Sequence, residues 1–155
     1  FYDALVKVRG YQSMAITDAA QRVQRSAHPG AYAQHENYAR ALASALRGYS
    51  PAKFTCQINP TRIGNTATVV TSVKAAFGDI DSIRAGDGAE FPLTGRAADV
   101  KARGWAIAHY LVGNASHLGI STISFGGRQW DASKSDQGWS PRTATDHDIV
   151  RVSTN

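Results

Sequence analysis

The chain has 155 residues, 43% of them hydrophobic, which is enough for the core of one domain with a small helical appendage. Its net charge of +5 favours anionic partners, but the basic residues are too scattered for a nucleic-acid groove, so we expect no nucleic-acid partner. No apolar run is long enough to span a membrane, and the single cysteine, Cys56, excludes an internal disulfide and a two-cysteine metal knuckle.

Residues 1–48 show the three-to-four spacing of apolar residues that is typical of helices. We predict three short helices here. The second covers 18–26 with Thr17 as its N-cap, and the third covers 31–47 with Gly48 as its C-terminal cap.

Residues 49–65 contain helix-breaking residues with polar residues between them, namely Pro51, Pro60 and Gly64. This composition is typical of a linker. We therefore predict a helical segment over 1–48, a linker over 49–65 and a separate domain over 66–155.

The predicted domain mixes helices and short strands at irregular spacing. We expect a helix over 66–77, capped by Asn65 or Thr66 and ended by Gly78, and an amphipathic helix over 104–118, closed by Gly119. Strands are predicted at 80–83, 97–100, 120–125 and 148–153, with a long loop that holds Trp130, Gly138 and Trp139. The pattern predicts an α+β fold with a small, mostly antiparallel sheet.

Three blocks of this domain occur in order along the chain. They are Thr-Gly-Arg-Ala-Ala-Asp-Val at 94–100, Gly-Trp-Ala-Ile-Ala at 104–108 and Asp-Ile-Val-Arg-Val-Ser at 148–153. Together they make residues 66–155 resemble the D-Ala-D-Ala carboxypeptidase family of zinc peptidases, and especially a secreted bacterial branch with a paired-tryptophan loop. The resemblance implies the α+β fold that this family shares with Hedgehog domains.

The resemblance also implies where a zinc site would lie. The family pattern is Ser-x-His-x-x-Gly-x-Ala-x-Asp, followed near the end by an acid three residues before the last histidine of His-x-His. Asp99 falls on the aspartate ligand and Asp148 on the general base. In such sites zinc lowers the pKa of a bound water, and the nearby acid moves protons.

This chain departs from the pattern at four positions. The serine and the three histidines of the pattern are replaced, in order, by Glu90, Pro92, Ile149 and Arg151. Arg151 stands at a ligand position, and a guanidinium has no lone pair to offer a metal. We therefore expect Arg151 to take the place of the metal in an ion pair with Asp99, shared with Asp148.

Some of these assignments have simpler alternatives. Asp99 is either a relic of a metal site or an ordinary carboxylate at the end of a strand. His147 either recruits a metal together with Asp99 or is a surface loop residue. We expect a binding site formed by Asp99, Arg151, Arg96, Trp130 and Trp139, and we assign Trp105 to the core.

The amino-terminal segment has a second resemblance, carried by Gln-Arg-Val-Gln-Arg-Ser at 21–26 and Ala-Tyr-Ala at 31–33. It is similar to helical segments that follow lysozyme-like or transglycosylase-like stretches in secreted bacterial proteins. Glu36 is a candidate acid, but glycoside hydrolysis needs a second carboxylate, and none can be nominated. We expect no glycosidase activity.

The leading hypothesis is an inactive homologue of a zinc D,D-carboxypeptidase, secreted or in the cell envelope, that binds peptidoglycan or an envelope protein. It requires no cofactor. Two alternatives remain open. One is an active D,D-peptidase with a rebuilt zinc site that uses Asp99, Asp148 and His147, and the other is a structural module of an envelope complex.

Overall fold

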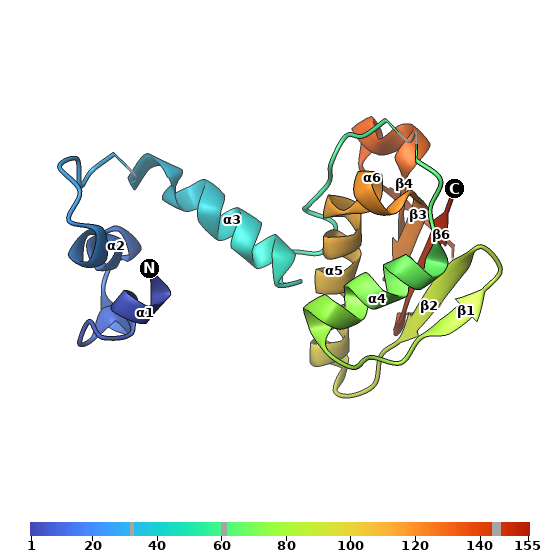
Figure 1. The fold of residues 1–155 in the computed structure, drawn as a ribbon, viewed down its shortest axis with the longest axis horizontal. Helices are drawn as coiled ribbons and strands as arrows, with labels where there is room; N and C mark the ends of the chain where they lie inside the picture. Colours follow the sequence, from blue (N-terminus) through green and yellow to red (C-terminus); the bar gives the residue numbers. More distant parts are fainter. Residues whose placement is uncertain (32, 60–61, 144–146) are drawn as a thin grey trace. The chain divides into compact units, whose positions relative to one another are not determined.

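A computed structural model describes residues 1–31, 33–59, 62–143 and 147–155 (Figure 1). The chain divides into two compact units, Phe1–Leu42 and Ala43–Asn155. The division falls inside helix α3 (Glu36–Leu46), not in the predicted linker over 49–65.

The first unit contains short helices. They are α1 (Tyr2–Leu5), the 3₁₀ turn η1 (Tyr11–Ser13), α2 (Ile16–Gln24), the 3₁₀ turn η2 (Ala33–His35) and the start of α3. Helix α2 begins two residues earlier than predicted, with Ala15 in place of Thr17 at the N-cap, and ends at Arg25 in a left-handed conformation. The predicted helix over 31–47 corresponds to η2 and α3.

The segment that was expected to be a linker is built into the second unit. Phe54, Cys56 and Ile58 pack against the hydrophobic core. The indole N–H of Trp139 donates to the carbonyl of Phe54 at 2.8 Å. The hydroxyl of Ser135 accepts from the N–H of Ile58 at 3.0 Å and donates to its carbonyl at 3.1 Å. Buried polar groups need such partners, so residues 54–58 are part of the domain.

Two of the helices in the second unit show the predicted end signals. Helix α4 (Thr66–Phe77) starts at Asn65, whose side chain accepts hydrogen bonds from the N–H groups of Ala67 and Thr68, and it ends at Gly78. Helix α6 (Ala115–Leu118) is closed by Gly119 in the left-handed conformation.

Helix α5 (Ala97–Gly113) differs from its prediction. It begins seven residues before the expected start, so residues 97–100 form its first turn. The predicted strand at 97–100 is therefore wrong. Alanine is the best helix former, and two alanines open this segment, so local propensity and the observed helix agree.

The second unit contains a six-stranded antiparallel sheet with the order β1-β2-β6-β3-β4-β5. Its strands are β1 (Ile83–Ala85), β2 (Gly88–Pro92), β3 (Ile120–Phe125), β4 (Arg128–Asp131), β5 (Trp139–Pro141) and β6 (Ile149–Thr154). The 3₁₀ segment η3 (Ala132–Gln137) joins β4 to β5. This arrangement confirms the predicted α+β fold and resolves the predicted loop after β3 into two further strands.

The core lies between one face of the sheet and the helices α4, α5 and α6, which lie on one side of it (Figure 1). Along β6, Val150 and Val152 are buried, whereas Arg151 and Ser153, which alternate with them, are only half-buried. This alternation is typical of a strand that has one face on a core. The opposite face carries the polar side chains.

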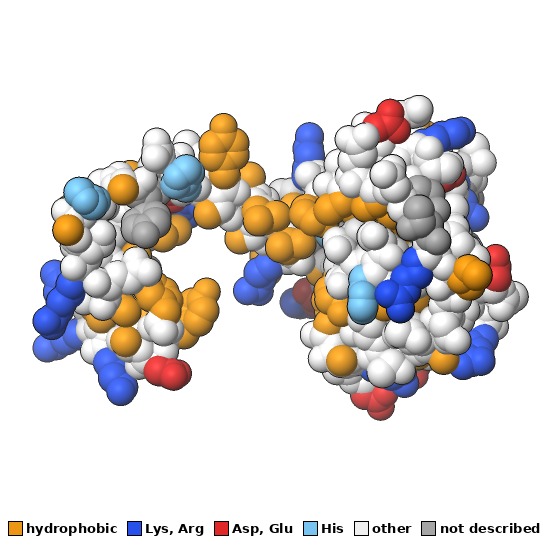
Figure 2. All heavy atoms as spheres, turned by 45° about the horizontal axis from the view of Figure 1, so that its top comes forward, with side chains coloured by type: hydrophobic (Ala, Val, Ile, Leu, Met, Phe, Trp, Pro, Cys, Tyr) orange, Lys and Arg blue, Asp and Glu red, His pale blue; other side chains and the backbone are white. Residues whose placement is uncertain are grey.

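Within the described residues, no helix is both long and apolar enough to span a membrane. Lys and Arg side chains are spread over both units on the face drawn in Figure 2. Large hydrophobic side chains are also exposed, among them Tyr38, Leu42 and Leu46 on helix α3.

Candidate binding cavity

The three ligand positions implied by the resemblance lie on three elements. Pro92 ends β2 and stands opposite Ile149 in β6. Arg151 lies two residues further along β6, opposite Glu90 of β2 and Ser124 of β3. Asp99 lies in the first turn of α5.

Arg151 and Asp99 each have a different partner from the one predicted. The Nε of Arg151 lies 2.9 Å from a carboxylate oxygen of Glu90, and both side chains are about three-quarters buried. Asp99 accepts two hydrogen bonds from Arg96, at 2.7 and 3.2 Å.

The predicted ion pair between Arg151 and Asp99 is therefore wrong. Strand register places Glu90 directly across from Arg151, and Arg96 lies three residues before Asp99 at the start of the same helix. Both pairings follow from backbone geometry. Arg96, predicted as a binding residue, here holds the Asp99 carboxylate.

The residues at these positions do not fit a zinc ion. Proline has no side-chain donor atom, and the guanidinium of Arg151 stays protonated. Among the described residues, no three His, Cys, Asp or Glu side chains gather to form a metal-binding group. Asp99 is the one ligand type of the family pattern that this chain keeps.

A cavity of about 1000 Å³ opens where β2 leads into α5, and we call it the β2–α5 cavity. Its apolar lining consists of Leu93, Ala97, Val100, Trp105 and Phe125, and its polar side chains are Thr94, Lys101, His147 and Asp148. Gly95 and Gly126 add backbone to the wall. The mixture of an apolar surface and a few polar groups is typical of a ligand site.

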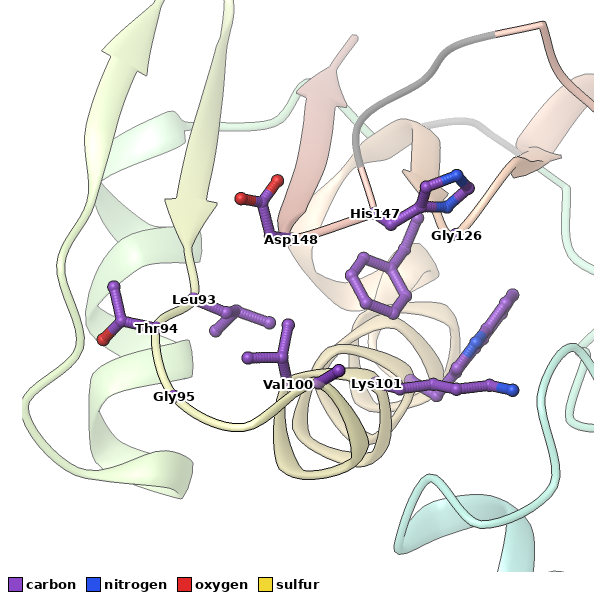
Figure 3. Close-up of a pocket in the computed structure, with 11 residues that line it drawn as sticks. Leu93, Thr94, Gly95, Val100, Lys101, Gly126, His147 and Asp148 are labelled. Atoms are coloured by element: carbon purple, nitrogen blue, oxygen red, sulfur yellow. The ribbon is translucent and has the colours of Figure 1, made fainter.

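Two features of the chain position this lining. The N–H of Leu93 donates to the carbonyl of Asp148 at 2.8 Å, which ties the end of β2 to the approach to β6. The chain then turns through Gly95, whose φ of 128° is accessible to glycine, and enters α5. Leu93 and Val100 come from the two sides of this turn (Figure 3).

The polar groups of the cavity are separated by chemical type. Figure 3 shows the Asp148 carboxylate on one side of the lining and the His147 imidazole and the Lys101 ammonium group on the other, whereas the Thr94 side chain points away from the other labelled residues. Lys101, His147 and Asp148 are all exposed. None of them takes part in an ion pair within the described residues.

The structure brings Asp148 and His147 together in this cavity but places Asp99 elsewhere. Asp99 lines a neighbouring cavity of about 200 Å³ with Pro92 and Arg103. Arg151 lines a small hollow of about 10 Å³ on the other face of the sheet. Asp148, Asp99 and Arg151 thus line three different cavities.

All three tryptophans lie in the core or pack against it. Trp130 is fully buried, and its indole N–H donates to the Thr55 hydroxyl at 3.1 Å, so it is a core residue and not part of a binding surface. Trp139 packs against that core. Trp105, assigned to the core, is indeed 3% exposed, but it also lines the β2–α5 cavity and contacts Trp139 with ring centroids 5.1 Å apart.

His109 is a buried histidine that contacts Trp105. His109 has no exposed surface, and its ring lies 5.3 Å from that of Trp105. Its Nδ1 lies 2.7 Å from the carbonyl oxygen of Ala45. Burial lowers the pKa of His109, and the hydrogen bond to Ala45 opposes this effect only in part. Neutral His109 therefore donates from Nδ1 to Ala45.

Sequence reasoning missed Lys101. With residues 97–100 assigned to a strand, Lys101 had no place beside Trp105. In the helix, Ala97, Lys101 and Trp105 follow one another at intervals of four residues and share one face. This spacing was the signal that could have identified the cavity wall.

Comparison with known proteins places the chain in a family. No curated protein and no solved structure matches the chain. The family described as VldE, C-terminal domain, matches residues 55–149, which is more than half of the chain and contains the whole lining of the β2–α5 cavity. The chain therefore belongs to the family of the VldE C-terminal domain.

Proposed function

We propose that residues 43–155 form a binding domain of the bacterial cell envelope, derived from a zinc D,D-peptidase but without its hydrolytic metal site. Its ligand in this proposal is peptidoglycan, held in the β2–α5 cavity. The protein is accordingly secreted or held in the envelope. The domain acts by binding, and no chemical step is assigned to it.

The observation that carries the proposal is the pairing of the former ligand positions. The Asp99 carboxylate is held by Arg96, and Arg151 is held by Glu90. Hydrolysis in the peptidase family requires ligands that converge on one ion and leave it a water. These residues engage in other contacts, and the third position is a proline. The arrangement supports loss of the ion, while the neighbouring β2–α5 cavity, which none of these three residues lines, remains open.

The cavity itself supports a binding role. A volume of about 1000 Å³ is sufficient for several residues of a peptide. Its apolar wall offers contact to methyl groups, and Lys101, His147 and Asp148 are exposed polar groups of the lining. Peptidoglycan peptides combine alanine methyl groups with amino and carboxyl groups.

The test is sedimentation of the full chain with purified peptidoglycan sacculi. Ala97 is exposed and lines the cavity, so Ala97→Trp should fill the cavity without disturbing the core and should reduce the bound fraction severalfold. Ala75→Trp, on the exposed side of α4, is the matched control and should bind like the parent. Equal binding by both variants would contradict the assignment of the cavity.

A second arm separates binding from hydrolysis. Metal content is measured by mass spectrometry, and the protein is incubated with muropeptides that end in D-alanine. Release of D-alanine that depends on a stoichiometric metal ion would overturn the proposal in favour of an active peptidase with a rebuilt site. Retention of envelope proteins without retention of sacculi would instead favour a structural module.

A further inference from the structure

The β2–α5 cavity is polarised, and this polarity indicates the chemistry of its ligand. We infer that it binds an amphoteric peptide, with an ammonium group at the Asp148 side and a carboxylate at the Lys101 side. The inference rests on the proposed function, because it assumes that this cavity is the ligand site. It adds which chemical groups are recognised and in which direction the peptide lies.

The first step of the argument is that the charged groups are available. In the part of the chain that the structure describes, the ion pairs use the carboxylates of Glu36, Asp79, Glu90 and Asp99. Asp148 and Lys101 belong to none of them, and both side chains are exposed. Neither is therefore engaged in an ion pair with a described residue.

The second step is their separation. The Asp148 carboxylate and the Lys101 ammonium group lie on opposite sides of the lining (Figure 3), so they do not neutralise each other directly. Opposite charges at the two ends of one site favour a ligand with the complementary arrangement and disfavour a ligand with a single net charge.

The third step is the apolar wall. Val100 is half-buried and Leu93 is buried, and both contribute to the lining together with the ring of Phe125. A hydrocarbon side chain or a methyl group gains free energy when it covers such a surface. The ligand is therefore a short peptide whose charged ends flank an apolar middle.

The experiment uses four synthetic dipeptides. The reference is Nα-acetyl-L-lysyl-D-alanine, which has one ammonium group and one carboxylate. The others carry an acetylated lysine side chain, a carboxyl-terminal amide, or both. Dissociation constants are measured by NMR titration of the full chain, which is isotope-labelled for this purpose. Loss of either charge should weaken binding about two- to fivefold, the range for exposed ion pairs.

Variants assign each charge to its partner. Asp148→Asn should bind the reference and the side-chain-acetylated peptide equally and should still discriminate against the amide. Lys101→Met should bind the reference and the carboxyl-terminal amide equally, and it should still bind the side-chain-acetylated peptide more weakly. Asp136→Asn and Lys134→Met are matched controls on exposed positions of η3 outside the cavity, and they should discriminate as the parent does.

The inference is overturned if no dipeptide binds, if the four bind equally, or if neither variant removes a discrimination. The sacculus assay, run on the same protein preparation, separates this failure from failure of the proposed function. In one outcome, Ala97→Trp loses sacculus binding but the four dipeptides bind alike. This result supports the proposed binding domain and rejects only the amphoteric ligand. Absence of sacculus binding rejects the proposed function.

Discussion

At the scale of single residues, His109 makes the second unit sensitive to acid. Its pKa is lowered from the ordinary value of 6.5 by burial, so the unfolded chain takes up protons at a higher pH than the folded chain does. The contribution of His109 to stability is complete above about pH 6.5 and decreases as the pH falls below it. We predict that the free energy of unfolding decreases between pH 7.5 and 5.5.

The measurement is urea denaturation across this pH range. His109→Phe should leave the carbonyl of Ala45 without its donor, which costs about 1–3 kcal/mol at pH 7.5, and should flatten the pH dependence below 6.5. His117→Gln, at an exposed position of α6, should keep the parental slope. An unchanged slope in His109→Phe would show that other groups cause the acid sensitivity.

Sequence reasoning nominated individual site residues but could not predict which of them pair. Asp148 does line the cavity, and His147, weighed as a metal ligand, lies beside it. The partner of Arg151, by contrast, is fixed by the register between β2 and β6, which connects residues 61 positions apart. The indole N–H of the buried Trp130 donates to the Thr55 hydroxyl, 75 positions away, whereas the neighbours of Trp130 in the sequence are polar. Local composition carries no signal of such contacts.

At the scale of elements, Gly104 allows α5 to approach the sheet. A Cβ at this position would lie 2.0 Å from the ring of Phe125. We predict that Gly104→Ala destabilises the second unit by about 1–3 kcal/mol, because the overlap forces helix and strand apart. Thermal or urea unfolding measures the loss.

Gly113, at the other end of α5, is the matched control. There an added Cβ would lie 3.5 Å from the ring of Phe54, which is ordinary contact. Gly113→Ala should be neutral or should stabilise the helix by up to about 1 kcal/mol. Equal effects of both substitutions on stability would mean that the close approach of Gly104 to Phe125 does not limit how α5 packs on the sheet.

Asn65 provides a second test at this scale. Its side chain accepts hydrogen bonds from the first turn of α4, at 2.9 and 3.3 Å. Asn65→Ala should lower the free energy of unfolding by about 1 kcal/mol, and Asn65→Ser, which keeps an acceptor, should restore most of it. If serine and alanine were equivalent, the cap would contribute nothing measurable.

Elements with strong local signals were predicted well. The cap at Asn65 and the glycine at Gly78 define α4, and β3 was predicted with both of its ends. The strand expected at 97–100 failed because a four-residue apolar and polar pattern fits a strand and a helical turn equally well. Strands β4 and β5 were missed because they are short and polar, and they exist through pairing with their neighbours.

At the scale of the whole molecule, the division inside α3 predicts which fragment folds. Residues 43–48 contain the Ala45 acceptor of His109, and Gly48, where a Cβ would overlap the carbonyl of Ala102. A fragment 43–155 should match the unfolding midpoint of the second unit in the full chain. A fragment 49–155 should be less stable by about 1–3 kcal/mol, because it leaves the buried His109 donor unpaired.

Circular dichroism during urea titration compares the two fragments. The fragment 49–155 begins where the sequence alone places the end of the helical segment, so the comparison also decides between the two boundaries. Equal midpoints would support the boundary after Gly48 and would mean that the end of α3 is dispensable. The overall α+β class was predictable because helical and strand-like patterns alternate along the chain, but the boundary depends on contacts that no local pattern reports.

The sheet ends on both sides in strands of three residues. At one edge β5 finishes at Pro141, which has no backbone N–H to offer to another strand, and at the other edge β1 carries the charged Arg84. Short edges, proline and charge all discourage the addition of a foreign strand. A domain of this kind can be kept at high local concentration beside copies of itself without the sheets joining into aggregates.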